Sequence, residues 1–274
     1  MNINVDKQSG MSLIELMIAS TLSLILLVGV VQIFVSTKTA YVTTENISRA
    51  QENGRFALDV LSRYTRMAGY WDYTMLDATP DPFESRCDTP GDPCSQDGTG
   101  NNNSDRLAIQ YFSPDDIDCN GNPTTANSVS KNIFWIEKDA EGVSSLYCHG
   151  YDNAKDEWLG SARPYISGVD SMQILYGIQD SSGSVTQFVN TGRMNNYKDD
   201  NADGDINDPG EFEWFNVRAI KMALLAQSGL SDDGTFKERT YVLLDSDPLK
   251  FDDGQSRYVF STTFLIPNVE ELSP

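Results

Sequence analysis

The longest pattern in the chain is a run of 22 residues without a charge, from Leu16 to Thr37. At about 1.5 Å per residue it forms a helix of about 33 Å, enough to cross the roughly 30 Å hydrocarbon core of a bilayer. A secretory signal would instead need a basic start, a shorter apolar region and a small-residue cleavage site. Here Lys7 is opposed by Asp6, and no such site follows before Tyr41. The run therefore predicts a retained helix that spans or anchors in a membrane.

Beyond Lys38 the pattern changes from wholly apolar to amphipathic. Apolar or small residues recur at spacings of three and four, which places them on one stripe of a helix. The stripe consists of Ile47, Ala50, Gly54, Ala57, Leu61, Tyr64 and Ala68, widened by Phe56, Val60 and Met67. We expect it to pack on a globular domain, with Gly69 as the stop. Because no flexible linker intervenes, one helix over about residues 12–68 is predicted, with Gly29 and Gly54 as soft points.

The rest of the chain favours short strands rich in β-branched and aromatic residues, separated by turn signals. The predicted strands are Leu107–Phe112, Ile133–Ile136, Ser145–Cys148, Met172–Ile178, Val185–Val189, Val217–Leu225, Thr240–Leu244 and Tyr258–Leu265. Residues 89–104 are rich in Gly, Pro and Asn and are predicted to form a long loop. A long N-terminal helix packed on an antiparallel β-sheet head gives an α+β fold.

Charge and histidine content narrow the possible functions. The chain has 40 acidic and 20 basic residues, a formal charge of −20, so nucleic-acid binding by the bulk of the acidic head is disfavoured. His149 is the one histidine, which removes most histidine metal sites and Ser-His-Asp triads. We expect His149 to be a strand-end residue without a catalytic role. With no catalytic set apparent, the chain is predicted not to be an enzyme.

Four cysteines follow the membrane segment and therefore face the exported side if the leader stays cytoplasmic. They are Cys87, Cys94, Cys119 and Cys148. An even number in an oxidising compartment favours two disulfides, for which three connectivities exist. We expect Cys87–Cys94 and Cys119–Cys148, because the DTPGDP segment between the first two can turn back on itself; the other connectivities stay open. A zinc site is disfavoured because no C-x-x-C pair is present.

An acidic segment beginning at Asp199 matches the first half of a calcium loop, D-x-[DN]-x-[DN]-G. Ca²⁺ binds six to eight oxygens, and alternate positions turn inward around a glycine bend. The candidate ligands are Asp199, Asn201, Asp203, Asp205 through its carbonyl, and Asn207 directly or through water. The twelfth position is Gly210, and the carboxylate of Glu211 comes one residue late. Both a Ca²⁺ site and a solvated acidic turn are therefore open.

Gly10 followed by Met11-Ser12-Leu13-Ile14-Glu15-Leu16 resembles the class III signal of type IV pilins and their relatives. The resemblance implies that a membrane prepilin peptidase cuts after Gly10 and methylates Met11, where the family usually has Phe. Independently of the family, the amine of Met11 and the carboxylate of Glu15 would lie four residues apart on one helix face. When such helices pack in a fibre, Glu15 can neutralise the buried amine of a neighbour.

Four later blocks resemble the PilW type of minor pilin. They lie at residues 54–73, 168–180, 217–228 and 257–268. The resemblance implies a minor pilin, held in the bacterial inner membrane with its head in the periplasm, that helps to initiate type IV pilus assembly and joins the tip complex. The partners it implies are the inner membrane, prepilin peptidase, other minor pilins, the major pilin and a tip adhesin.

The same resemblance divides the chain into the parts of a pilin-like fold. These are a leader at 1–10, a transmembrane and assembly helix at 11–37, its amphipathic continuation at 38–69 and a periplasmic β-rich head at 70–274. Two alternatives remain. A J-type minor pseudopilin of type II secretion shares the leader and the helix. A membrane-anchored periplasmic hydrolase or adhesin belongs to a different class, and no catalytic set supports the hydrolase.

Overall fold

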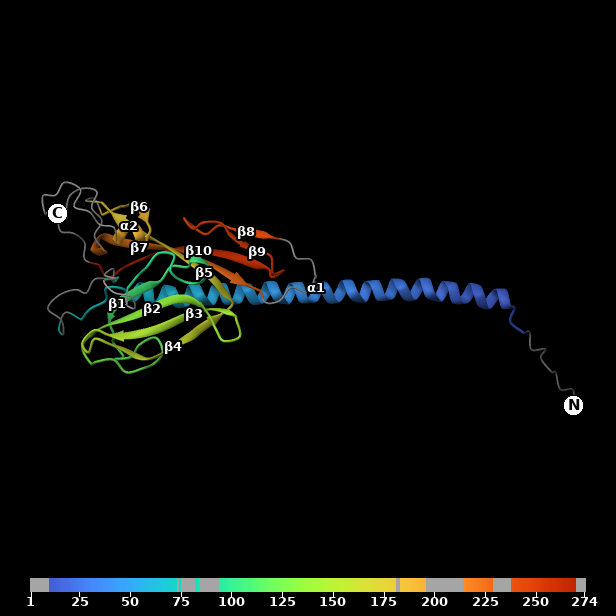
Figure 1. The fold of residues 1–274 in the computed structure, drawn as a ribbon, viewed down its shortest axis with the longest axis horizontal. Coiled ribbons are helices and arrows are strands. Elements are labelled where there is room, and N and C mark those ends of the chain that lie inside the picture. Colours follow the sequence, from blue (N-terminus) through green and yellow to red (C-terminus); the bar gives the residue numbers. More distant parts are fainter. Residues whose placement is uncertain are drawn as a thin grey trace, which may run out of the picture. The chain divides into compact units, whose positions relative to one another are not determined.

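The computed structural model describes residues 10–72, 74, 82–83, 94–180, 183–195, 214–228 and 238–269. The chain divides into two compact units, residues 1–45 and 46–274. The fold is α+β, as predicted: a long N-terminal helix, α1 (Leu13–Met67), precedes antiparallel sheets (Figure 1). The unit boundary falls within α1, eight residues beyond the predicted end of the membrane segment at Thr37.

The first unit contains the N-terminal part of α1. The carbonyl of Ser12 accepts hydrogen bonds from the amides of Glu15, at 3.1 Å, and Leu16, at 3.2 Å, which starts the helix. Glu15 lies in the first turn, where its carboxylate complements the positive end of the helix dipole. Every large apolar side chain from Met11 to Val35 is more than half exposed. This part of α1 therefore gains no stability from packing within the first unit.

In the second unit α1 is amphipathic, and one face is buried in the head. The buried residues of the helix are Ala50, Gly54, Ala57, Leu61, Tyr64 and Thr65. These positions confirm most of the predicted stripe, but Phe56 is 54% exposed, so its assignment to the stripe was wrong. The helix ends at Met67, and Gly69 takes φ +70°, a left-handed conformation that favours glycine after a helix.

Gly54 is a point of close approach rather than a soft point of the helix. A Cβ at this position would lie 2.4 Å from ring atoms of Phe260, which belongs to the last strand of the head. The helix runs without interruption through Gly54. The missing side chain therefore lets the helix backbone approach an aromatic ring, and the prediction of a flexible joint there is wrong.

The described part of the head contains two four-stranded antiparallel sheets and a two-stranded ribbon (Figure 1). The first sheet has the order β1 (Leu107–Phe112), β2 (Val129–Lys138), β3 (Ser144–Asp152), β4 (Glu157–Ser167). The second has the order β10 (Arg257–Leu265), β7 (Val217–Gln227), β5 (Val169–Gln179), β6 (Val185–Val189). The ribbon pairs β8 (Arg239–Tyr241) with β9 (Leu249–Phe251). Short helices are η1 (Asn101–Asn103), α2 (Thr191–Asn195) and η2 (Trp214–Asn216).

One hydrophobic cluster joins the buried face of α1 to both sheets. Leu61 is fully buried, and the ring of Tyr64 lies 5.0 Å from that of Phe134 on β2, measured between centroids. On the second sheet Met172 and Ile174 of β5 are also fully buried. Burying a large apolar side chain contributes about 1.5–3 kcal/mol. This shared core therefore holds the C-terminal part of α1 and the two sheets together in the second unit.

A buried ion pair fixes the start of β10 against β5. The Nε of Arg257 lies 2.6 Å from the Oδ2 of Asp170, and both side chains are no more than 5% exposed. The guanidinium also donates to Asp253, whose side chain is 42% exposed. The hydrogen bond from Arg257 holds the pKa of Asp253 below its usual value. Arg257 therefore has one buried and one solvated carboxylate partner.

These two carboxylates give a matched pair of substitutions. We expect Asp170→Ala to lower the free energy of unfolding by about 2 kcal/mol, because a buried charged hydrogen bond is lost while Asp253 still partners Arg257. Asp253→Ala removes a solvated partner and is expected to cost less than about 1 kcal/mol. Urea denaturation of the two variants measures both values. Equal losses would contradict the assignment of Asp170 as the structural partner.

Candidate functional site

The apolar part of α1 is the first candidate functional surface. Among the described residues, α1 is the one helix long and apolar enough to cross a membrane. Met11 is 73% exposed, and Glu15 is also exposed at the start of the helix. A carboxylate at bilayer depth costs about 2.5–3.5 kcal/mol, so a carboxylate at the start of an apolar helix is usually paired with another group. This surface is suited to lipid and to neighbouring apolar helices.

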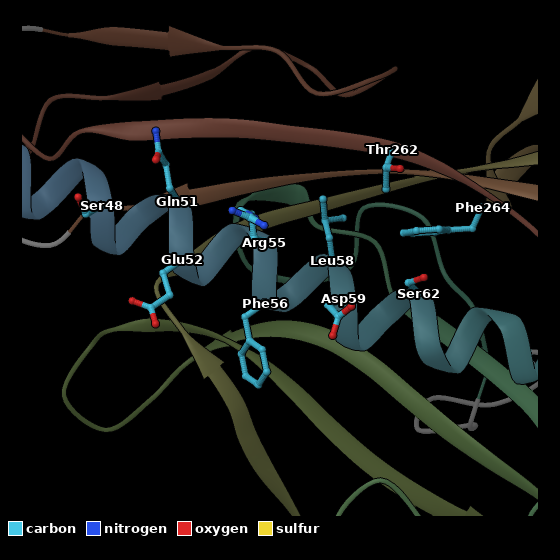
Figure 2. Close-up of a pocket in the computed structure, with 10 residues that line it drawn as sticks. All are labelled: Ser48, Gln51, Glu52, Arg55, Phe56, Leu58, Asp59, Ser62, Thr262 and Phe264. Atoms are coloured by element: carbon cyan, nitrogen blue, oxygen red, sulfur yellow. The ribbon is translucent and has the colours of Figure 1, made fainter.

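A groove on the head runs along the outward face of α1. It has a volume of about 680 Å³ and is bordered by Thr262 and Phe264 of β10. Figure 2 shows Phe56 projecting from the helix, with Glu52 and Asp59 on turns either side of it. Phe56 was predicted to be in the core, and its position at the surface places an aromatic ring among charged side chains. Aromatic and arginine side chains, here Phe56 and Arg55, are enriched at protein contact surfaces.

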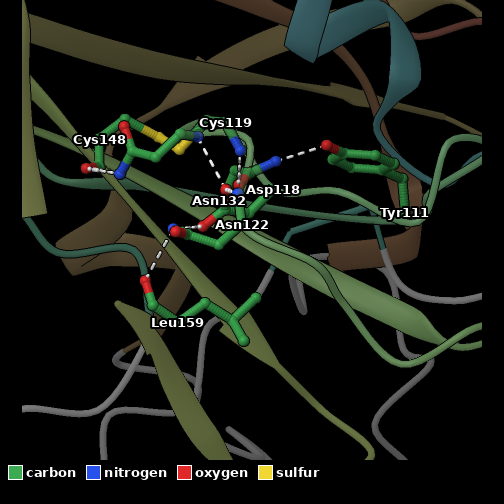
Figure 3. Close-up of a disulfide and its surroundings, with 8 residues drawn as sticks. Tyr111, Asp118, Cys119, Asn122, Asn132, Cys148 and Leu159 are labelled. Atoms are coloured by element: carbon green, nitrogen blue, oxygen red, sulfur yellow. Dashed lines mark hydrogen bonds between the residues drawn. A yellow bond between two sulfur atoms is a disulfide. The ribbon is translucent and has the colours of Figure 1, made fainter. Parts of the chain in front are cut away.

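A disulfide between Cys119 and Cys148 ties a loop to β3 (Figure 3). This is one of the two pairings that the sequence predicted. Asn132 of β2 accepts a hydrogen bond from the amide of Cys119 at 2.9 Å and donates to the hydroxyl of Tyr111. Asn120 donates to the carbonyl of Cys148 at 2.9 Å. The loop is therefore fastened to the first sheet by a covalent bond and by polar contacts on both sides of it.

The other predicted cysteine pairing is only partly within the described residues. Cys94 is buried and takes part in a disulfide. Cys87 lies outside the described residues, so the bond between Cys87 and Cys94 stays a prediction. The predicted calcium ligands, Asp199, Asn201, Asp203, Asp205 and Asn207, also lie outside the described residues. Calcium binding by that segment stays a prediction.

His149 lies inside β3 rather than at the end of a strand, because β3 continues to Asp152. Its ring stacks on that of Trp158 with centroids 4.5 Å apart. Burial lowers its pKa below the usual value, and the carbonyl of Gly160 at 3.4 Å only partly opposes this. The neutral form is therefore favoured at pH 7. The geometry gives His149 a packing role beside an aromatic cluster that the sequence reasoning missed.

Two known families match separate parts of the chain, one at the N-terminal helix and one in the head. Residues 6–31 match the model of the prokaryotic N-terminal methylation motif. Residues 133–268, which contain most of both sheets, match the model of type IV pilus-assembly protein W, called PilW. The chain therefore combines a prepilin-type N-terminal motif with a region that matches PilW. The methylation motif implies processing by a prepilin peptidase and assembly with other pilins, and the apolar helix implies membrane anchoring.

Among solved structures, this pilin-like protein is similar to a type IV-like pilin from Thermus thermophilus, with 12% sequence identity and a TM-score of 0.44. The similarity covers 80% of this chain and 97% of that one. No match was found among curated proteins. Families of this kind are structural rather than enzymatic, so the functional surfaces to consider are those that contact lipid, other pilins and ligands.

Proposed function

We propose that this PilW-domain protein is a minor pilin that helps to initiate type IV pilus assembly and forms part of the pilus tip complex. The observation that carries the proposal is one unbroken helix whose first part is exposed apolar surface and whose second part is built into a head with a PilW match. The helix supplies a means of insertion into a fibre core. The head supplies the surface that distinguishes this subunit from others.

The mechanism begins with cleavage after Gly10 and methylation of Met11. The new N-terminal amine and the carboxylate of Glu15 then occupy the same face of the first helical turns. In a bundle of apolar helices, Glu15 of one subunit neutralises the amine of its neighbour. Removing one partner of a buried ion pair costs about 3–5 kcal/mol, so this contact sets the axial register of the incoming subunit.

The head is placed on the periplasmic side in this proposal. A disulfide between Cys119 and Cys148, together with the bonded Cys94, suits an oxidising compartment, since cytosolic thiols are kept reduced. The groove beside Phe56 then serves as a contact for sibling minor pilins during formation of the tip complex. The formal charge of −20 keeps such heads apart unless a specific surface brings them together.

Photo-crosslinking at Phe56 tests the proposed membership of a tip complex. A photoreactive residue replacing Phe56 in cells should give adducts with other minor pilins of the pilus, whereas the same residue at Lys155, an exposed position in the turn between β3 and β4, should not. Adducts with subunits of a type II secretion system would instead assign the chain as a minor pseudopilin. Absence of adducts with either set would contradict the role of this groove.

A further inference from the structure

A second hollow lies on the face of the first sheet that points away from the core. It has a volume of about 540 Å³, and aromatic side chains from three adjacent strands line it: Trp135 of β2, His149 of β3 and Trp158 of β4. Small-molecule sites are commonly concave, of about 300–1,000 Å³, and lined by aromatic residues with a few polar groups. This hollow, here called the aromatic cleft, has both features, and its lining residues are separate from those of the groove beside Phe56.

The cleft is shaped by an irregularity in β4. Cys148 of β3 pairs with Arg163 of β4, but two residues later Gly150 pairs with Leu159, so β4 carries extra residues opposite His149. Gly160 lies in this bulge with φ +65°, a conformation that favours glycine. Bulges bend a strand and redirect side chains, and they are frequent beside functional sites.

Both indole rings are held in fixed orientations. Trp135 stacks on Tyr147 with centroids 5.8 Å apart, and its Nε1 donates to Glu137 at 2.9 Å. Trp158 is stacked on His149, as described above, and meets Tyr151 edge-on at 5.3 Å. Rings that are already immobilised lose little conformational entropy when a ligand stacks on them. The cleft is therefore preorganised for a flat apolar surface.

Hydrogen-bonding groups surround these rings. The Cζ of Arg106 lies 5.9 Å from the centroids of both Trp135 and Trp158. Gln96 and Thr99 also line the cleft, and the backbone of Gln96 pairs with that of Arg106 in both directions, at 3.0 and 2.8 Å. This pairing fixes the segment that carries the polar side chains against the start of β1. Arg106 thus lies over the aromatic floor, and Gln96 and Thr99 line the cleft beside it.

We propose that the aromatic cleft binds a saccharide ring. A pyranose has an apolar face of C–H groups that stacks on an indole, and a rim of hydroxyls that hydrogen-bonds to amide, hydroxyl and guanidinium groups such as those of Gln96, Thr99 and Arg106. A phosphorylated ligand fits less well, because Arg106 is the one Lys or Arg among the described residues that line the cleft, on a chain of charge −20. A proline-rich peptide also docks in aromatic-lined grooves, so it is included in the test as the competing occupant.

Binding is tested with the full chain in detergent micelles. The protein is first screened on a panel of neutral and carboxylated oligosaccharides. Each oligosaccharide that retains the protein is then titrated into it while tryptophan fluorescence is recorded. We expect a neutral saccharide to bind and Trp158→Ala to weaken binding at least tenfold. Gln96→Ala leaves the aromatic floor intact and should weaken binding severalfold. This second variant keeps the test decisive if Trp158→Ala does not fold. Phe56→Ala, at an exposed aromatic ring outside the cleft, should bind as the wild type does.

Three results would overturn the proposal. One is that no oligosaccharide binds more strongly to the wild type than to Trp158→Ala. Another is that Phe56→Ala weakens binding as much as the cleft variants do. The last is that a proline-rich peptide, run beside the sugars, binds the cleft while the sugars do not. None of these results depends on the proposed role in pilus assembly, since the protein is assayed outside the fibre.

Discussion

Replacing Glu15 by Gln should leave the protein cleaved and membrane-bound but lower its incorporation into pili by at least about tenfold, since the loss of a buried charge partner costs about 3–5 kcal/mol. Gln keeps the shape of the side chain and removes only its charge. Cleavage depends on residues around Gly10, so the processed form should accumulate in the membrane. Immunoblots of sheared pili and of membranes measure the two pools.

Glu15→Asp is the matched control, because it keeps the carboxylate and shortens its reach by one methylene. We expect it to retain more incorporation than Glu15→Gln. If Glu15→Gln enters pili at the level of the wild type, the carboxylate does not pair with a neighbouring subunit. An autonomous adhesin anchored in the membrane would show that result, since it needs no register in a fibre.

Loss of the disulfide between Cys119 and Cys148 is expected to destabilise the head strongly. The bond joins residues separated by 29 positions, and closing a loop of this size stabilises a fold by about 3–4 kcal/mol in the chain-entropy account. Both sulfurs are in buried residues, with Cys148 fully buried. We therefore expect the double variant Cys119→Ala, Cys148→Ala to unfold at a markedly lower urea concentration than the wild type.

The hydrogen bonds around this disulfide supply its control. Asn120→Ala removes the bond to the carbonyl of Cys148 but leaves the covalent link, and is expected to cost about 1 kcal/mol. A double cysteine variant no less stable than Asn120→Ala would show that the polar contacts, rather than the covalent bond, hold the loop.

The helix and most strands follow from local patterns in the sequence. Spacings of three and four placed Ala57, Leu61 and Tyr64 on the buried face of α1, and two strands have the predicted bounds, Leu107–Phe112 and Val185–Val189. These segments could be predicted because their burial follows the period of the element. Phe56 was misassigned because its position beside the stripe says nothing about how far the head extends around the helix.

The strands β4 and β9 were missed for physical reasons. β4 contains Gly160 and Pro164 and is largely exposed, so it has neither the composition nor the alternation of a typical strand. It pairs through one edge only, and its irregular register follows from contacts with β3. β9 is three residues long and gives almost no pattern. Both strands are specified by their partners rather than by their own sequences.

The candidate sites also differ in whether the sequence alone could locate them. Gly10, Met11 and Glu15 form a contiguous motif, so sequence alone could locate them. The aromatic cleft combines Trp135, His149 and Trp158 with Arg106, and only the pairing of β2, β3 and β4 brings them together. Trp158 gave no signal beforehand, because the strand that carries it, β4, was itself missed.

The most direct test of the account is to determine the N-terminal residue of this protein recovered from purified pili. Edman degradation or mass spectrometry should find a chain that begins at N-methylated Met11, with Glu15 as its fifth residue. A protein in pili that retains residues 1–10, or that begins at any other position, would contradict the assembly of this helix through its new amine.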